Sequence, residues 1–154
     1  RLEAASRAAG YPVISSAQAI CAALAALNAK RIALVSPYPS WLSEAAQSYW
    51  REQGLTLTSV AGLPTDLLDT RGIYRLTTAR VLEICAMLDT SDADAVVLSG
   101  TGMPTLRAMA SLSATVPVVS SNLCLAWLLG KAAGGDSALE PWLSPGAAWR
   151  KRLA

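Results

Sequence analysis

Short apolar runs rich in valine and isoleucine alternate along this chain with longer segments whose apolar residues recur every three or four positions. The short runs predict β-strands, and the longer segments predict helices with one apolar face. The third run alternates between apolar and polar residues and is expected at a sheet edge, whereas the others are continuous, as in strands covered on both faces. The predicted strands are Tyr11–Ile14, Arg31–Ser36, Leu55–Ala61, Asp94–Ser99 and Val116–Ser120.

The helical segments carry start and stop signals. Ser15 or Ser16 is placed to cap the first helix, and Gly54 supplies a left-handed stop for the second. Pro104 suits a first helical turn, and Gly134-Gly135 ends the last helix. The predicted helices are Ser16–Asn28, Ser40–Gln53, Thr77–Leu88, Pro104–Ser111 and Asn122–Ala133.

Strands that alternate with helices predict right-handed crossover connections. The expected fold class is therefore α/β, with an open, mostly parallel sheet and helices on both faces, as in a flavodoxin-like or Rossmann-like lobe. The 154 residues suit one domain. We assign that domain to residues 1–135 and interpret residues 136–154, with their prolines and tryptophans, as a C-terminal tail packed on the outside.

Composition excludes several classes of protein. The chain has no histidine, which excludes a Ser-His-Asp triad, a Cys-His pair and any zinc site that contains histidine. Thirteen Lys and Arg against eleven Asp and Glu are too even a balance to predict a nucleic-acid surface. No apolar run approaches the roughly 18 residues of a membrane span, and three well-separated cysteines are expected as reduced thiols. We expect a cytoplasmic protein with no nucleic-acid or membrane partner and no metal.

The loop Ser99–Thr105 is the strongest candidate for ligand binding, because ligands of parallel sheets bind where the strands end. Gly100 and Gly102 allow backbone N–H groups to turn inward, and the following helix adds partial positive charge, so the loop suits a carboxylate or phosphate. It has neither the lysine of a Walker A loop nor a third glycine, since position 105 is Thr. An ordinary turn between strand and helix is the alternative.

Other candidates are weaker. Tyr38 stands between two prolines beyond a strand, where its hydroxyl can donate to a ligand or the ring can simply pack. Asp66, Asp69 and Arg71 can form a polar pair over the site or a solvated loop, and Ser120–Asn122 can cap the next helix. The remaining aromatic residues and thiols are predicted to pack: Trp41, Tyr49, Trp50, Trp127, Cys21, Cys85 and Cys124.

Three segments in order are similar to one known family: Arg31-Ile32-Ala33-Leu34-Val35-Ser36-Pro37-Tyr38, then Asp94-Ala95-Val96-Val97-Leu98-Ser99-Gly100-Thr101-Gly102, then Val116–Asn122 followed by Ala126-Trp127. Together they resemble the aspartate/glutamate racemase superfamily, in the branch of arylmalonate decarboxylase and maleate cis-trans isomerase, over most of the chain. The resemblance implies that Tyr38 binds a substrate carboxylate. It also implies a substrate site formed with Ser99, Gly100, Thr101, Gly102 and Thr105.

Two departures from the family pattern matter. The family motif Asp-Ala-x-x-x-Ser-Cys has its catalytic cysteine where this chain has Gly100, and the Thr101 hydroxyl is far too weak an acid to replace a thiol. Family members also have two similar lobes, with another cysteine in the first. The chain is therefore expected to be the C-terminal portion of a longer protein, with half of the active cleft upstream of Arg1.

The resemblance implies cofactor-independent chemistry at a carbon next to a carboxylate, as in a racemase, a decarboxylase or a cis-trans isomerase. Backbone N–H groups of Gly100, Thr101 and Gly102, with the hydroxyls of Tyr38 and Thr105, would bind the carboxylate and stabilise negative charge. A thiolate from the other lobe would act as nucleophile or proton carrier. We expect an isomerase or decarboxylase of a small carboxylic or dicarboxylic acid, inactive as these 154 residues alone.

Two alternatives stay open. The chain can be a non-catalytic module that binds or senses a small acid, which predicts saturable binding without turnover. It can also be a flavodoxin-like or receiver-like domain that shares only the rhythm of strands and helices, which leaves the three matched segments unexplained. Apolar surface exposed by a missing lobe would favour a homo-oligomer.

Overall fold

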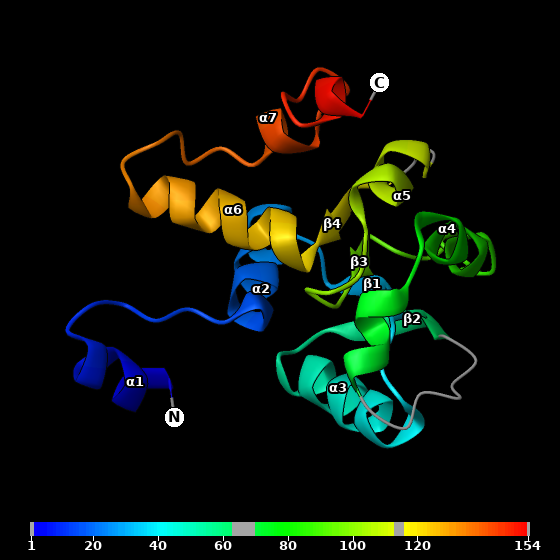
Figure 1. Ribbon diagram of the computed structural model, residues 1–154, viewed down its shortest axis with the longest axis horizontal. Helices are drawn as coiled ribbons and strands as arrows, with labels where there is room; N and C mark the ends of the chain where they lie inside the picture. Colours follow the sequence, from blue (N-terminus) through cyan, green and yellow to red (C-terminus); the bar gives the residue numbers. More distant parts are fainter. Residues whose placement is uncertain (1, 63–69, 113–115, 154) are drawn as a thin grey trace.

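The computed structural model describes residues 2–62, 70–112 and 116–153, and it contains one parallel sheet of four strands (Figure 1). The strands lie in the order β2-β1-β3-β4 and all pair in parallel. This confirms the predicted α/β class and the edge position of the third predicted run. The strands are β1 Arg31–Ser36, β2 Thr56–Gly62, β3 Ala95–Leu98 and β4 Val118–Ser120.

The predicted strand Tyr11–Ile14 is wrong. This segment is an extended connection between α1 (Leu2–Ala9), which was not predicted, and α2 (Ser16–Ala26). It has no partner strand in the described part of the chain, and Tyr11 is 66% exposed. Helix α1 has no buried residue and lies apart from the sheet (Figure 1). An apolar run therefore does not become a strand unless the fold places another strand beside it.

The helices around the sheet begin largely where their caps were predicted. Ser15 forms a capping box with Gln18, in which the Ser15 hydroxyl accepts from the Gln18 N–H at 3.1 Å. Ser120 caps α6 by accepting from the Leu123 N–H at 3.3 Å. Gly54, with φ of +77°, follows the end of α3 as predicted. The remaining helices are α3 Ser40–Glu52, α4 Thr78–Ala86, α5 Leu106–Ser111 and α6 Ser121–Ala132.

Helix α5 starts two residues later than predicted, because Thr105 is its N-cap and Pro104 precedes the helix. The connection before α4 is also more ordered than the loop expected there, since Thr70–Arg75 forms the 3-10 helix η1. Arg71 lies exposed on η1, whereas Asp66 and Asp69 are outside the described residues.

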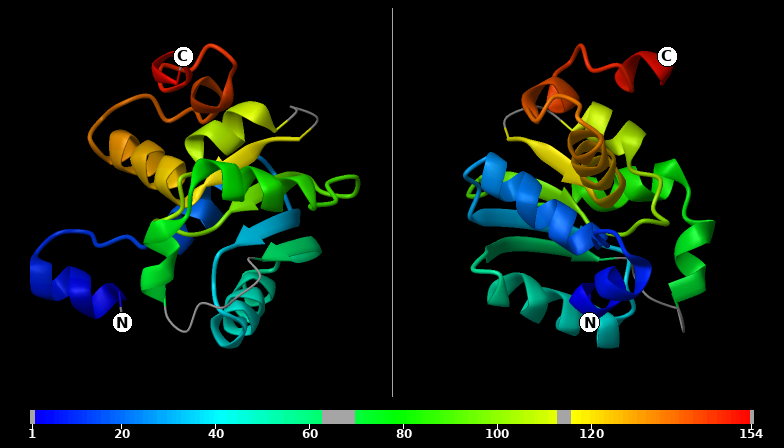
Figure 2. Two further views of the ribbon diagram at one scale, coloured as in Figure 1. Left: turned by 45° about the vertical axis from the view of Figure 1, so that its right-hand side comes forward. Right: turned by 90° about the vertical axis from the view of Figure 1, so that its left-hand side faces the viewer.

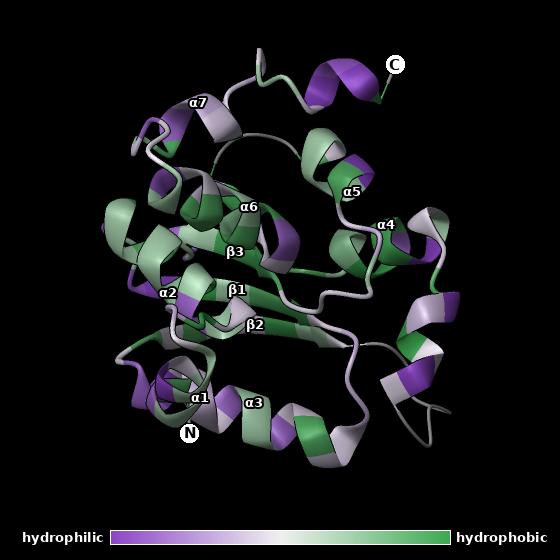
Figure 3. Cartoon of the chain, turned by 60° about the vertical axis from the view of Figure 1, so that its left-hand side comes forward, coloured by the Kyte–Doolittle hydropathy of each residue, from purple (hydrophilic) through white to green (hydrophobic). Residues whose placement is uncertain are grey.

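The helices form two layers around the sheet. The chain leaves β1 towards β2 but leaves β3 in the opposite direction towards β4, so right-handed crossovers put α3 on one face and α5 on the other. Helices α2 and α6 pack side by side (Figures 1 and 2). The two central strands, β1 and β3, are strongly apolar (Figure 3), as expected for strands covered on both faces.

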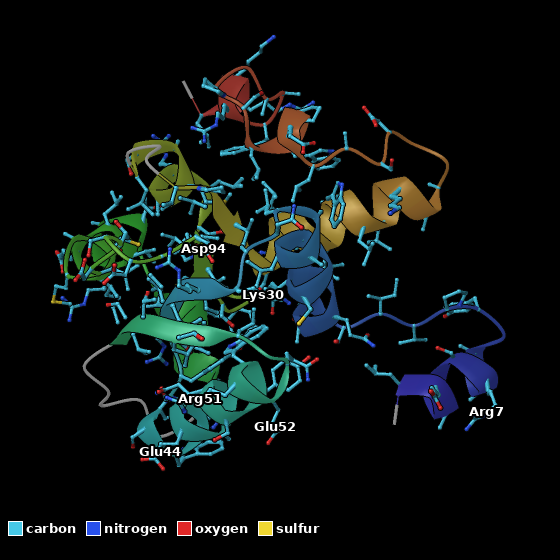
Figure 4. All side chains as sticks on the ribbon, turned by 180° about the vertical axis from the view of Figure 1, so that it is seen from behind. Arg7, Lys30, Glu44, Arg51, Glu52 and Asp94 are labelled. Carbon is cyan, nitrogen blue, oxygen red and sulfur yellow. The ribbon has the colours of Figure 1, made fainter. Side chains whose placement is uncertain are left out.

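The core contains most of the side chains that were predicted to pack. Trp50 and Trp127 are each 3% exposed, and Cys85 and Cys124 are buried. Trp41 is the exception: it lies in the first turn of α3 and is 63% exposed. The charged residues of α3 also point outward (Figure 4).

Residues 136–153 pack against the domain through α7 (Glu140–Leu143) and the 3-10 helix η2 (Arg150–Arg152). Leu139 and Ala147 are buried there, and the Trp149 Nε1–H donates to the Trp142 carbonyl at 2.7 Å. Within the described ranges, no helix has the length and hydrophobicity needed to cross a membrane.

Candidate functional site

A cavity of about 180 Å³ lies where β1 and β3 end. These two central strands connect in opposite directions, and such a reversal opens a crevice at the carboxyl ends of the strands, where ligands of open α/β sheets bind. The cavity brings Tyr38 and Ser99 together, although they are far apart in the sequence. Its lining comes from α2, α3 and the two strand ends: Ser16, Ala17, Ile20, Tyr38, Ala46, Tyr49, Trp50 and Ser99.

The polar side chains of this lining all carry hydroxyls, on Ser16, Tyr38, Tyr49 and Ser99. A hydroxyl can both donate and accept, so such a cavity can surround the oxygens of a carboxylate without a charged side chain. Tyr49 also shares a hydrogen bond with Cys21. Burial raises the pKa of both groups, which keeps them protonated and able to donate near neutral pH.

One of these residues, Tyr49, was missed as a site candidate, whereas Ser15–Ser16 was expected both as a helix cap and as a weaker candidate for ligand binding at a strand end. Tyr49 was predicted only to pack, because it belongs to a helically spaced aromatic set. Nothing local in the sequence indicates that α2 and α3 converge on the end of β3, since that depends on the packing of the helices on the sheet.

Ser36, the last residue of β1, adds an unusual feature beside the cavity. It is 2% exposed, yet its hydroxyl has no hydrogen-bond partner in the described part of the protein. A buried polar group without a partner is costly. Ser36 stands two residues before Tyr38, at the end of a central strand.

The first turn of α3 provides further hydrogen-bond donors, in the form of backbone N–H groups. Its N-cap is Pro39, which has no side chain able to cap, although the Pro39 carbonyl accepts from the N–H groups of Leu42 and Ser43. In the described ranges, the N–H groups of Ser40 and Trp41 have no partner. Free N–H groups and the helix dipole both favour an anion near this end of α3.

The glycine-rich loop is fastened to α6 instead of lining the cavity. The Gly100 N–H donates to the Ser121 hydroxyl at 2.9 Å, so this N–H, expected to face a ligand, is already used. The Asn122 amide donates to the Thr101 carbonyl at 3.0 Å. The N–H groups of Thr101 and Gly102 have no partner among the described residues, and remain available.

Thr105, the last predicted site residue, also lies outside the cavity at the ends of β1 and β3, which we call the hydroxyl cavity. It is 4% exposed and lines a second, larger cavity on the other side of the glycine-rich loop. The structure thus brings two of the six predicted residues into one cavity and distributes Gly100, Thr101, Gly102 and Thr105 along the loop beside it.

Both the backbone conformation and the neighbouring side chain at position 100 favour glycine. Its φ is +140°, and a Cβ atom there would lie 2.8 Å from Pro37 Cγ and 3.1 Å from Pro37 Cδ. A cysteine at this position, as in the family motif, would require both the loop and the Pro37 ring to move. Elsewhere in the described ranges, no three His, Cys, Asp or Glu side chains converge to hold a metal ion.

A parallel α/β domain with a hydroxyl-lined cavity at its strand reversal has the architecture in which open α/β sheets commonly hold their ligands. The sequence profile of the family described as Asp/Glu/Hydantoin racemase matches residues 1–129. The chain belongs to this family, which confirms the resemblance seen in the three sequence segments.

Individual relatives agree with this assignment. The maleate isomerase of Pseudomonas putida is 36% identical over 139 residues, which are 88% of this chain and 53% of the relative. The arylmalonate decarboxylase of Bordetella bronchiseptica is 29% identical over 87% of this chain and 57% of its own length. The chain therefore spans about half the length of the curated relatives it matches.

Solved structures show the same fold. A variant of the Nocardia farcinica maleate cis-trans isomerase, with a covalently bound succinylcysteine intermediate, superposes with a TM-score of 0.81. It is 27% identical, and the match covers 99% of this chain and 63% of that one.

Proposed function

We propose that this chain forms the acid-binding side of a cofactor-independent isomerase or decarboxylase that acts on a small carboxylic or dicarboxylic acid. The observation that carries the proposal is the cavity at the strand reversal, in which Tyr38 and Ser99 meet two further hydroxyls. Its relatives include a maleate isomerase and an arylmalonate decarboxylase, whose names both indicate small dicarboxylic acids.

In this proposal the donors hold one carboxylate and stabilise negative charge as it develops beside it. Removal of a proton, loss of carbon dioxide or addition of a nucleophile to a conjugated double bond each places negative charge next to the bound carboxylate. Hydroxyls of Tyr38 and Ser99 and the N–H groups that begin α3 are already oriented by the fold, and such preorganised donors lower the barrier.

The group that moves the proton or attacks the substrate is proposed to come from outside these residues. Burial raises the pKa of Cys85 to about 11 and that of Cys124 to about 12, and the pKa of Cys21 is also raised. Thiols with raised pKa values are poor nucleophiles, and Gly100 stands where the family motif has cysteine. We assign the role to the part of the family fold that this chain does not span.

The test compares Tyr38→Phe and Ser99→Ala with Tyr11→Phe, a matched control at a residue that is 66% exposed and outside the cavity lining. Calorimetric titrations with malonate and maleate measure binding by the chain. Each site variant should weaken binding by at least about tenfold, because a hydrogen bond to a charged group contributes about 1.5–3 kcal/mol, while the control stays unchanged. Equal binding by all variants, or no saturable binding to the unaltered chain, would refute the proposal.

A second candidate is a binding module without catalysis, and the Gly100 geometry favours it. The two functions are separated by proton NMR, which follows maleate and malonates during incubation with the chain joined to the remainder of its family fold. Turnover that Tyr38→Phe reduces supports the enzyme. Saturable binding without turnover supports the binding module.

A further inference from the structure

The larger cavity lies beyond the glycine-rich loop and has a volume of about 520 Å³. Its floor is the stretch from Met103 to Arg107, one wall is the beginning of α6, and the opposite wall is the C-terminal tail. The tail lies over α5 and α6 in two different views (Figures 1 and 2). This volume is within the range of pockets that bind small organic molecules.

The lining is predominantly apolar, with Met103, Leu123 and Ala126 facing two tryptophans, Trp142 and Trp149. Both indole rings are only partly buried, so they offer flat aromatic surface to the cavity. Burying such a surface against a ligand is favourable in proportion to the apolar area removed from water.

The tryptophan wall is held in place before any ligand binds. Trp149 donates its indole N–H to the Trp142 carbonyl at 2.7 Å, and the Arg150 guanidinium stacks 4.7 Å from the Trp149 ring centroid. The Trp142 ring packs close to Gly130 of α6. A wall fixed in this way loses little conformational entropy on binding, which favours affinity.

The cavity also has a charge preference. Arg107 lines it, is exposed, and forms no hydrogen bond or ion pair through its guanidinium with any described residue. The nearby η2 carries Arg150, Lys151 and Arg152 and is strongly hydrophilic at its surface (Figure 3). The rim is therefore positive, while the interior is apolar.

We infer that this cavity is a second small-molecule site, which takes an apolar carboxylic acid with an aromatic body. The ring lies between Met103, Leu123 and the tryptophan wall, and the carboxylate lies at the rim near Arg107. The inference is independent of the proposed function, because the cavity does not include Tyr38 or Ser99. Its occupant is larger and more apolar than the acid proposed for the hydroxyl cavity.

The test uses phenylbutyrate as the probe and phenylbutyramide, its uncharged analogue, as the comparison. Proton–nitrogen correlation spectra of the chain resolve the indole N–H signals of its five tryptophans. Phenylbutyrate should shift the signals of Trp142 and Trp149 in a saturable manner and leave those of Trp41 and Trp50 unchanged. This measurement needs no variant and therefore does not depend on whether a variant folds.

Two variants then locate the site. Ala126→Phe fills the cavity from an exposed position on α6 and should weaken phenylbutyrate binding at least about tenfold, whereas Ala132→Phe, on the same helix but outside the lining, should not change it. Arg107→Gln should weaken binding of the acid by up to about fivefold and leave the amide unaffected, whereas Arg51→Gln, at an exposed position on α3 outside the lining, should have little effect on either.

Several outcomes would overturn the inference. One is the absence of a saturable shift, and another is binding that Ala126→Phe leaves intact. Equal affinity for acid and amide would overturn the assignment to a carboxylic acid. Shifts of Trp142 and Trp149 that depend on protein concentration without added ligand would overturn it in favour of a second copy of the chain.

Discussion

Replacing Gly100 with alanine should lower the free energy of unfolding for two reasons, the backbone conformation at this position and a close contact with Pro37. The backbone there has φ of +140°, a conformation that costs a residue with a side chain about 1–3 kcal/mol. The new Cβ atom would also lie 2.8 Å from Pro37 Cγ, and overpacking of this kind costs about 1–3 kcal/mol more. The free energy of unfolding should therefore fall by about 2–6 kcal/mol.

Urea denaturation followed by tryptophan fluorescence measures this change. Gly54→Ala is the matched control, because Gly54 also has a positive φ, of +77°, but a Cβ atom there would meet nothing within 4 Å. It should cost only about 1 kcal/mol, the price of left-handed backbone alone. The difference between the two variants measures the contact with Pro37.

A double-mutant cycle with Pro37→Ala tests the cause directly. If the Pro37 ring is what the new side chain strikes, then the double variant should be more stable than the sum of the two single effects predicts, by about 1 kcal/mol or more. A Gly100→Ala variant no less stable than Gly54→Ala, or strict additivity in the cycle, would refute the reasoning. Gly100→Cys should show the same destabilisation and should not by itself confer turnover.

Three further predictions concern stability and reactivity. Hydrogen bonds from the backbone N–H groups of Arg31 and Lys30 lower the pKa of Asp94 from 3.8 to about 2. The stabilisation from this carboxylate is therefore present above pH 3.8 and lost as the pH falls towards 2. Asp94→Asn should remove that part of the pH dependence of the urea midpoint. Trp50→Ala should lower the free energy of unfolding by about 3–5 kcal/mol, whereas Trp41→Ala, at a 63% exposed site, should change it by less than about 0.5 kcal/mol in the same assay. Iodoacetamide at pH 8 should alkylate Cys21 before Cys124, because burial raises the pKa of Cys124 to about 12; peptide mass spectrometry at timed intervals would contradict this if both react at one rate.

The ion pair between Arg31 and Asp94 shows how the sheet is tied together at its amino end. The Asp94 carboxylate accepts from the Arg31 side chain at 3.0 and 3.1 Å, and it also accepts from the backbone N–H of Lys30 at 2.9 Å (Figure 4). The sequence placed Asp94 at a strand start within a family motif, but only strand pairing shows that it closes the gap between β1 and β3.

Local features of the fold were predictable because they depend on neighbours a few residues away. Arg31–Ser36 is a strand with the predicted bounds, and the caps at Ser15 and Ser120 form hydrogen bonds only three residues along the chain. The failures lie where that condition does not hold. Tyr11–Ile14 has the composition of a strand but pairs with no described strand, and Trp41 has helical spacing but is 63% exposed.

The order of residues alone determined the alternation of strands and helices, the family and the exclusion of histidine chemistry, because each follows from residue types and short spacings. Tertiary structure decided the site. It brought the start of α2 to Ser99, gave the Gly100 N–H to a hydroxyl 21 residues away, and placed the Pro37 ring where a side chain at position 100 would meet it. Such contacts follow from the direction of each crossover and the packing of helices on the sheet, which no local pattern specifies.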